Sequence, residues 1–469
     1  MRRHPPKIQH AAWLGVAAGL LVFQTDHPLD SDEGVVLAGA WNLLNGRAPY
    51  RDFFCVLPPG SFYLVSLGWR VFGESYLAAN ALACASLVLA ALGVHRLARL
   101  ATGNPWAPVA ALLFVLPSGL WPLVNHGSFG ITWVVWAALF FTRGLAGGRR
   151  VDFLLAGLLN GISMLFLLQR GLAALGAFAA FLLVLGLRER RRGWWGRAAL
   201  VGAGSLLPPL LLALVFPPRV LLENLVLFPM AHYLAVNRVP LLVLAGVGLA
   251  VAASALALRR ARRRPVWGLL VLQVALLAAA LPRPDFYHLT IVLFPFYALL
   301  PLVARALREE ALAWRAALAP ALGFPIAFVA VAYVANVPAL LATPRVEDLR
   351  TLAYLREECG EAPLLYAGPF LPGLYFESRR LGATPYDYLF TGFHTPAQFA
   401  EAAAALARRR PQCAVLNYAM VARFGYRRAN PVDRFIAAHY RPVLREGTLR
   451  VYRLKDRKRR DPNPEPELE

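Results

Sequence analysis

Long apolar runs separated by short polar segments occupy most of the first 340 positions of the chain. A helix rises 1.5 Å per residue and a bilayer core is about 30 Å thick, so about 20 mostly apolar residues cross it. We identify eleven candidate runs, at residues 11–23, 76–92, 106–116, 129–141, 151–168, 172–187, 198–216, 241–258, 266–281, 289–303 and 316–337. The pattern predicts a polytopic α-helical membrane protein with about 11 transmembrane helices.

The apolar stretch 151–187 is interrupted by the polar segment Gln169-Arg170-Gly171. One uninterrupted helix over this stretch would be roughly 55 Å long, far more than a bilayer core requires. We therefore expect a turn at these three residues, between two spans.

The pattern changes after residue 340, where shorter elements alternate. Helical spacing covers 346–358 and 396–409, and strand-like segments cover 364–367, 414–418 and 448–453. This alternation predicts a small α/β domain over residues 340–456, after a transmembrane domain over 1–339 that includes a first outer loop, 24–75, with interfacial helices. Residues 457–469 are charged and proline-rich, and we expect a disordered tail.

The composition fits this division of the chain. Hydrophobic residues make up 58% of the chain and the mean hydropathy is +0.50, which excludes an ordinary soluble domain. The formal net charge is +22 although only 16% of residues are charged, and the basic residues lie in short clusters between apolar runs. This distribution is typical of membrane-protein loops and argues against a nucleic-acid-binding face.

Lys and Arg residues are about three times as frequent in one set of alternate loops as in the other. The positive-inside rule then places the N-terminus in the cytoplasm and the C-terminal domain outside the plasma (inner) membrane, in the periplasm or extracellular space. We interpret residues 1–23 as a retained helix because no small-residue cleavage site follows. Cys359 and Cys413 each precede a predicted strand, so they either form a disulfide between parallel neighbours or remain free thiols.

The first outer loop contains a predicted helix with two acidic residues in its first turn. Ser31 can cap a helix whose first turn carries Asp32 and Glu33, and Asn45-Gly46 can end it. Apolar residues between these points recur at helical spacing, which predicts a helix along the membrane surface with a carboxylate pair at its start. The simpler interpretation is that the two acids only stabilise the helix dipole.

The order of features around this pair is specific. The Asp-Glu-Gly start and the Asn-Gly stop are followed by Ala48-Pro49-Tyr50-Arg51-Asp52-Phe53-Phe54, then by Pro58-Pro59-Gly60, and much later by an Arg-x-Asp-x-x-His segment at 283–288. This arrangement resembles the integral-membrane glycosyltransferases of the GT-C fold, particularly the bacterial branch related to protein O-mannosyltransferases and the lipid A aminoarabinose transferase. The resemblance implies transfer of a monosaccharide from a polyprenyl-phosphate donor to a lipid, glycan or protein acceptor at the outer face, with inversion.

By the same resemblance, Asp32 is expected to act as general base, and Glu33 to orient it or to share with it a divalent ion such as Mg, Mn or Zn. Two positions depart from the family pattern. Leu57 stands where relatives often have a lysine that contacts the donor phosphate, and the second outer loop offers Asn125 and His126 where many relatives have an acid. Metal dependence is therefore left open.

Other polar residues are expected in the outer loops. Arg51, Arg170, Arg283 and His288 are candidate ligands of the donor phosphate, since a departing phosphate requires cations. Arg170 could instead extend its charged end to the interface, and Arg283 could form a local ion pair with Asp285. Acceptor-binding candidates, each with an alternative structural role, are His126, His232 and Tyr233.

Two other functions compete with glycosyl transfer. A lipid or saccharide transporter or flippase would be expected to show inverted repeats and polar groups within broken spans, but the acids here cluster in a loop and no internal repeat is visible. A membrane anchor that presents the C-terminal domain explains neither the loop motif nor the number of spans. The sugar, the acceptor and the oligomeric state are not determined by the sequence.

Overall fold

The computed structural model describes residues 29–103, 106–121, 123–232, 240–259, 261, 263–282, 284–309, 315–316, 319–341, 348–360 and 362–455. The chain divides into two compact units. The helical unit comprises residues 1–26, 55–231 and 235–343, and the α/β unit comprises 27–54, 232–234 and 344–469. Residues 27–54 thus join the α/β unit, whereas the sequence led us to group the whole first outer loop with the transmembrane domain.

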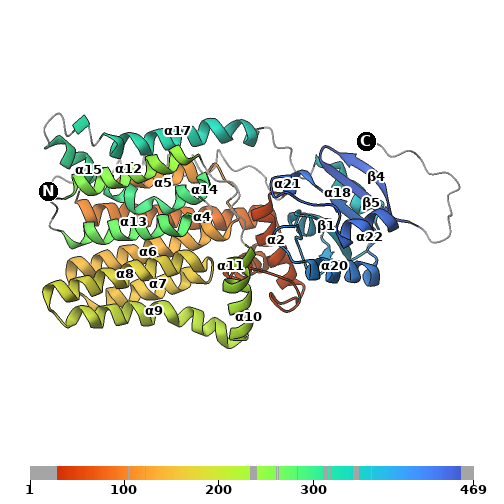
Figure 1. Cartoon of the computed structure of the whole chain (residues 1–469), viewed down its shortest axis with the longest axis horizontal. Coiled ribbons are helices and arrows are strands. Elements are labelled where there is room, and N and C mark those ends of the chain that lie inside the picture. Colours follow the sequence, from red (N-terminus) through yellow and green to blue (C-terminus); the bar gives the residue numbers. More distant parts are fainter. Residues whose placement is uncertain are drawn as a thin grey trace. The chain divides into compact units, whose positions relative to one another are not determined.

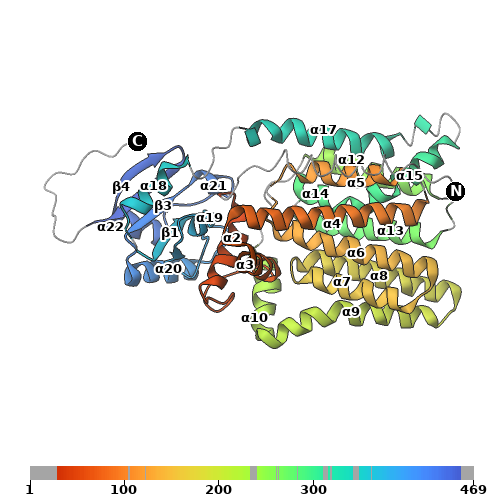
Figure 2. The ribbon, with the colours of Figure 1, turned by 180° about the vertical axis from the view of Figure 1, so that it is seen from behind.

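The long helices of the helical unit run side by side, whereas the short α10 and α11 run across their direction (Figures 1 and 2). The helices of this unit are α3 (Gly60–Phe72), α4 (Tyr76–Thr102), α5 (Ala107–Ser118), α6 (His126–Gly147), α7 (Arg150–Met164), α8 (Leu168–Glu189), α9 (Gly193–Val215), α10 (Pro218–Leu222), the π-helical η1 (Glu223–Leu227), α11 (Phe228–His232), α12 (Leu241–Ala257), α13 (Arg264–Ala280), α14 (Phe286–Val292), α15 (Phe294–Arg308) and α17 (Pro320–Leu341). The neighbours α6, α7, α8 and α9 pack against one another along the chain, and α4 packs against α5, α6 and α15.

Four helices in the described residues, α4, α6, α8 and α9, are long and apolar enough to cross a membrane, and the bent pair α14–α15 makes a fifth candidate span. Other predicted runs correspond to shorter apolar helices, α5, α12, α13 and the segment 322–334. A count of 11 is not confirmed, and the first predicted run, 11–23, lies outside the described residues.

The expected break within 151–187 exists, but it lies earlier in the chain. Helix α7 ends at Met164 and α8 begins at Leu168. Arg170 is therefore already helical, near the start of α8, and does not lie in the connection between the two helices. The turning residues are apolar because the break is buried, and the Leu165 carbonyl accepts a hydrogen bond of 2.8 Å from Gly60 N at the start of α3. A Cβ atom on Gly60 would collide with this carbonyl, so glycine permits the close approach.

The α/β unit contains a five-stranded sheet in the order β2-β1-β3-β5-β4. The strands are β1 (Leu364–Gly368), β2 (Leu381–Gly382), β3 (Cys413–Leu416), β4 (Tyr440–Glu446) and β5 (Leu449–Leu454), and the helices are α2 (Ser31–Leu44), α18 (Arg350–Glu357), α19 (Gly373–Glu377), α20 (Pro396–Arg409), α21 (Ala419–Ala422) and α22 (Pro431–His439). Strand β1 is parallel to β2 and β3, whereas β5 is antiparallel to β3 and β4.

Helices cover both faces of this sheet. One core joins Leu365, Ala367 and Val415 to α2, α18 and α19, and the other joins Tyr366 and Leu416 to α20 and α22. Successive side chains of a strand point to opposite faces of the sheet. Because helices cover both faces, the side chains of β1 are apolar throughout. The expected α/β domain is therefore present, and it contains further elements that the sequence pattern did not indicate, namely β2, β4, α19, α21 and α22.

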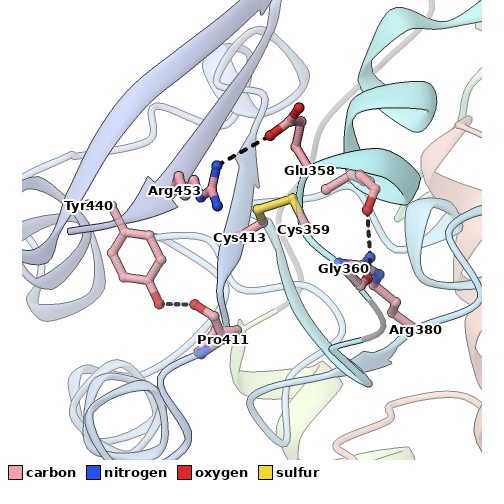
Figure 3. Close-up of a disulfide and its surroundings, with 9 residues drawn as sticks. Glu358, Cys359, Gly360, Arg380, Pro411, Cys413, Tyr440 and Arg453 are labelled. Carbon is pink, nitrogen blue, oxygen red and sulfur yellow. Dashed lines mark hydrogen bonds and ion pairs between the residues drawn. A yellow bond between two sulfur atoms is a disulfide. The ribbon is translucent and has the colours of Figure 1, made fainter. Parts of the chain in front are cut away.

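A disulfide joins the two cysteines of the α/β unit (Figure 3). Cys359 precedes β1 and Cys413 begins β3, and their Cα atoms lie 6.1 Å apart. Because β1 and β3 are parallel neighbours, the structure decides between the two alternatives in favour of the disulfide. Next to it, Arg380 Nη2 donates hydrogen bonds of 2.6 Å to the carbonyls of Leu355 and Gly360.

Candidate active site

The start of α2 carries the predicted carboxylate pair, in the α/β unit. Asp30 caps this helix, because its Oδ1 accepts hydrogen bonds from Asp32 N at 2.8 Å and Glu33 N at 3.1 Å. The prediction that Ser31 is the cap is wrong by one residue, and Ser31 begins the helix instead. Asp32 is half-buried, whereas Glu33 is 0% exposed. The two acids therefore occupy different environments, and Asp32 is the one with contact to solvent.

Helix α2 packs into the α/β unit, which differs from the expected helix lying along the membrane surface with one exposed face. Ala38 belongs to the core beneath the sheet, and Gly34 lies so close to Gly373 of α19 that a Cβ atom on Gly34 would approach Gly373 N within 2.5 Å. Trp41 Nε1 donates to the Arg380 carbonyl at 3.1 Å. Most of α2 is buried because nearly all its faces meet protein.

Asn42 fixes the later part of α2 through a buried carboxyl group. Its Nδ2 donates to Asp387 Oδ2 at 2.8 Å, and Arg47 Nη1 donates to the Gly382 carbonyl at 3.2 Å. Burial raises the pKa of the Asp387 carboxyl to about 7, although the charge of Arg47 and the hydrogen bond from Asn42 act in the opposite direction. As predicted, α2 ends at Asn45-Gly46, where Gly46 has a φ of 76°.

Arg51 is largely exposed in the α/β unit and forms an ion pair of 2.8 Å with Asp52. The guanidinium group of Arg51 lowers the pKa of the Asp52 carboxyl below its usual range, and the Ala48 backbone N–H, 2.7 Å from Asp52 Oδ2, acts in the same direction. A phosphate that binds Arg51 would therefore compete with a carboxylate next to it in the chain.

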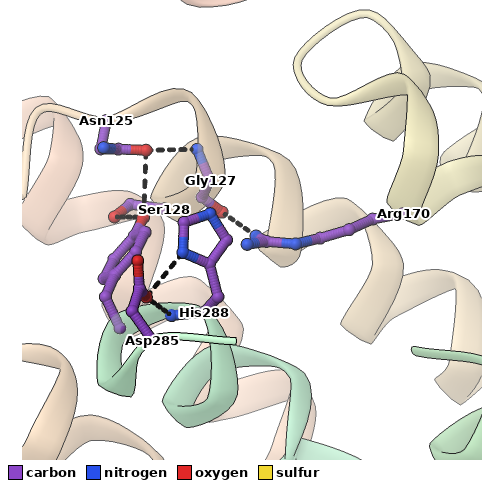
Figure 4. A network of polar contacts seen from close by, with 7 residues as sticks. Asn125, Gly127, Ser128, Arg170, Asp285 and His288 are labelled. Carbon is purple, nitrogen blue, oxygen red and sulfur yellow. Dashed lines mark hydrogen bonds and ion pairs between the residues drawn. The ribbon is translucent and has the colours of Figure 1, made fainter. Parts of the chain in front are cut away.

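A polar network in the helical unit gathers residues from three elements (Figure 4). Asn125 caps α6, with Oδ1 accepting from Gly127 N at 2.7 Å, and Tyr287 from α14 donates its hydroxyl to the same oxygen at 3.1 Å. The Tyr287 hydroxyl also lies 3.1 Å from Ser128 Oγ. These bonds join the start of α6 to the start of α14.

Arg170 of α8 reaches the same place. Its side chain is buried in the helical unit, with the residue only 3% exposed, and Nη1 lies 3.4 Å from the Gly127 carbonyl. A Cβ atom on Gly127 would lie 2.6 Å from the Tyr287 hydroxyl and 3.1 Å from Arg170 Nη1, so glycine is needed for this convergence. The guanidinium group thus points into the network, which disagrees with the alternative that Arg170 extends to the interface.

His288 completes the network from α14. Asp285 caps this helix by accepting from His288 N at 2.8 Å, and the same Oδ1 lies 2.7 Å from His288 Nδ1. A carboxylate on Nδ1 orients the imidazole ring and favours the tautomer that carries the proton on Nδ1. His126 is the first residue of α6 and is half-buried next to Asn125.

The predicted site residues thus fall into two groups. Arg170, His126 and His288 lie around the network of the helical unit, whereas Asp32, Glu33, Arg51 and His232, the last residue of α11, belong to the α/β unit. Arg283 and Tyr233 lie outside the described residues. The sequence drew attention to Asn125 as a departure from the family, but Gly127 and Ser128 carried no signal, because their role depends on α14 approaching from a distant part of the chain.

Among the residues that the structure describes, no group of three or more His, Cys, Asp or Glu side chains could hold a metal ion. The involvement of a divalent ion at Asp32 and Glu33 therefore stays a prediction.

An apolar groove of about 160 Å³ opens beside the start of α8 in the helical unit. Its walls come from the α7–α8 break (Met164, Leu165 and Leu168), from α9 (Pro209 and Leu212), and from α10 and η1. Arg170 follows Leu168 by two residues, so a guanidinium group and an apolar groove share one end of α8.

Comparison with known proteins identifies the fold. The family described as dolichyl-phosphate-mannose-protein mannosyltransferase matches residues 56–211, about a third of the chain. No curated protein matches the chain in sequence. Solved structures match almost the whole chain, and these comparisons give it the GT-C fold of polytopic membrane glycosyltransferases.

The individual matches are distant in sequence. ArnT from Cupriavidus metallidurans bound to undecaprenyl phosphate is 16% identical with a TM-score of 0.59, over 96% of this chain and 98% of that chain. The same protein in the apo state gives a TM-score of 0.57 at 16% identity, over 95% and 98%. The Archaeoglobus fulgidus oligosaccharyltransferase in the apo form gives 0.54 at 13% identity, over 92% and 72%. At these identities the likeness concerns the fold.

Proposed function

We propose that this protein is a glycosyltransferase that moves a monosaccharide from a polyprenyl-phosphate donor to a lipid, glycan or protein acceptor at the outer face of the membrane. The observation that carries the proposal is the fold match, over 96% of this chain, to an ArnT structure bound to undecaprenyl phosphate. The matched family is described by a related lipid-phosphate donor, dolichyl phosphate mannose.

In this proposal Asp32 is the general base. It accepts the proton of the acceptor hydroxyl as that oxygen attacks the anomeric carbon, and the bond from this carbon to the donor phosphate oxygen breaks, leaving the electron pair on the phosphate. Attack opposite to the leaving group inverts the anomeric centre. Asp32 suits this role better than Glu33 because Asp32 is half-buried, whereas Glu33 is enclosed by protein. Glu33 is assigned the role of orienting Asp32.

Arg170 and His288 are proposed to bind the departing phosphate. Preorganised cations stabilise the charge that develops on a leaving group, and a guanidinium group presents several N–H donors in one plane. The apolar groove at the start of α8 suits the first prenyl units of the donor. Arg51 and Arg283 are secondary candidates for the phosphate, and His126, His232 and Tyr233 are candidates for the acceptor.

The test is reconstitution of the purified protein in vesicles with a radiolabelled polyprenyl-phosphate sugar. We expect free polyprenyl phosphate and a labelled acceptor to accumulate together. Movement of the labelled donor across the bilayer without cleavage would instead identify a flippase. Mass spectrometry of envelope glycans and lipids from a deletion strain would name the missing sugar.

We also propose that the protein lies in the inner membrane with the α/β unit outside. The disulfide between Cys359 and Cys413 agrees with an oxidising compartment. Because both cysteines are 0% exposed, the test uses a cysteine introduced at the exposed Arg441 of the α/β unit, which is expected to react with an impermeant maleimide in intact cells. Labelling of Arg441→Cys only after the cells are opened would reverse the orientation.

A further inference from the structure

A bend interrupts the span formed by α14 and α15. The axes of the two helices differ by 58°, and Leu293 lies between them. Pro295 follows at the start of α15 and has no N–H to donate to the Ile291 carbonyl. A proline therefore explains why the helix breaks here, but it does not explain what holds the two halves at this angle.

The side chain of Gln273, in α13, bridges the break. It is 0% exposed, its Nε2 donates to the Val292 carbonyl at 3.2 Å, and its Oε1 accepts from Phe296 N at 2.9 Å. In an uninterrupted helix Phe296 N would donate directly to the Val292 carbonyl, because these residues are four apart. The amide of Gln273 thus lies between the donor and the acceptor of one missing helical hydrogen bond and satisfies both.

This bridge matters more in a bilayer than in water. Within the hydrocarbon core no water can satisfy a free backbone group, so each one left without a hydrogen bond carries a large free-energy penalty. Without Gln273, the bent form would leave two such groups unsatisfied at the break. The amide therefore stabilises the bent arrangement relative to a straighter helix.

The bend determines the direction of α14, and α14 carries Tyr287 and His288 next to its cap, Asp285. Tyr287 reaches Asn125 and Ser128 at the start of α6 through hydrogen bonds of 3.1 Å, which leaves little room for reorientation. We propose that Gln273 is a positioning residue, whose amide holds α14 at the angle that keeps Tyr287 and His288 in the network with Arg170. This inference rests on the proposed function, because that network is assigned there to the donor phosphate.

The first variants separate polarity from shape. Gln273→Met keeps the length of the side chain and removes both hydrogen bonds, and we expect kcat/KM for the donor to fall about tenfold to a hundredfold, as for a modest misplacement of catalytic groups. Gln273→Glu, when protonated, can donate and accept as the amide does, and burial in a span favours the protonated form. Transfer by Gln273→Glu should therefore approach that of the wild type at acidic pH and decline as the pH rises, beyond any decline in the wild type.

A matched control is Ser254→Ala in α12, whose hydroxyl is equally buried but bonds to Ala250 O of its own helix. It should leave transfer unchanged. The double variant Gln273→Met/Pro295→Ala restores an N–H and lets the helix straighten, so thermal stability should recover while transfer stays low. Wild-type kinetics in Gln273→Met, or full transfer by the double variant, would overturn the inference.

Hydrogen exchange of the segment 291–297, measured by mass spectrometry in nanodiscs, tests the bridge without any transfer assay. Gln273→Met should exchange faster there than the wild type, and Gln273→Glu at acidic pH should not. Unchanged exchange in Gln273→Met refutes the inference whatever the kinetics. Faster exchange in Gln273→Met, when the wild type itself transfers no sugar, would leave the bridge standing and remove the proposed function.

Discussion

Replacement of Asp32 by Asn distinguishes a catalytic role from a structural one. The change keeps the size of the side chain and removes its charge and basicity. The cap of α2 is unaffected, because Asp30 supplies the oxygen that accepts from Asp32 N and Glu33 N. Asp32 itself is half-buried, so the amide can be accommodated without a new cavity.

The two roles predict effects of different size. If Asp32 only interacts with the helix dipole, its replacement costs about 0.3–1 kcal/mol of stability and leaves transfer intact. If Asp32 is the general base, the rate should fall about 10²- to 10⁴-fold, which corresponds to roughly 2.7–5.5 kcal/mol in activation free energy. The expected result is the larger loss in rate with a nearly unchanged melting temperature.

The assay is release of polyprenyl phosphate in reconstituted vesicles under single-turnover conditions, with the melting temperature measured on the same preparation. Glu33→Gln is the paired variant. Because Glu33 is fully enclosed, we expect Glu33→Gln to lower the melting temperature more than Asp32→Asn does. A greater loss of rate at Glu33 than at Asp32, at equal stability, would move the base by one residue. Full transfer by the double variant would refute the mechanism.

Three further outcomes are expected. Arg170→Ala should raise the donor KM about tenfold to a hundredfold. Arg170→Lys should have an intermediate effect, because lysine keeps the positive charge but lacks the planar guanidinium group. An unchanged KM in both variants would show a purely structural role. Replacing Cys359 and Cys413 by Ala should lower the free energy of unfolding of the α/β unit by up to about 4 kcal/mol in denaturant titrations, since the disulfide closes a separation of 54 residues; an unchanged midpoint would contradict this. The pKa of Asp387 is raised to about 7, so between about pH 4 and pH 7 the folded state binds more protons than the unfolded chain. Stability therefore falls as the pH rises through this window. Asp387→Asn should flatten the dependence of the melting temperature on pH, and an equal slope in both proteins would refute the assignment.

The sequence by itself determined the elements whose signals are local. Apolar runs of membrane length indicated long helices such as α4 and α9, and alternation after residue 340 indicated the α/β domain. The helix predicted at 396–409 has those bounds in the structure, where Thr395 and Gln398 form a capping box at its start. Asn45-Gly46 ends α2 as expected. Caps, stops and periodicity depend on neighbours within a few residues, so they can be recognised without a fold.

Tertiary structure alone decided the features that depend on distant contacts. The polar residues at 169–171 suggested a turn, but the break lies in apolar residues, where the Leu165 carbonyl accepts a hydrogen bond from Gly60 N of a distant segment. Helix α2 has the spacing of a surface helix, yet it is buried because α19 and the sheet cover it. Gln273 looks like one polar residue in an apolar run, and its meaning depends on a helix break about 20 residues later in the chain. Burial and hydrogen-bond partners are properties of packing between segments far apart in sequence, and no local pattern encodes them.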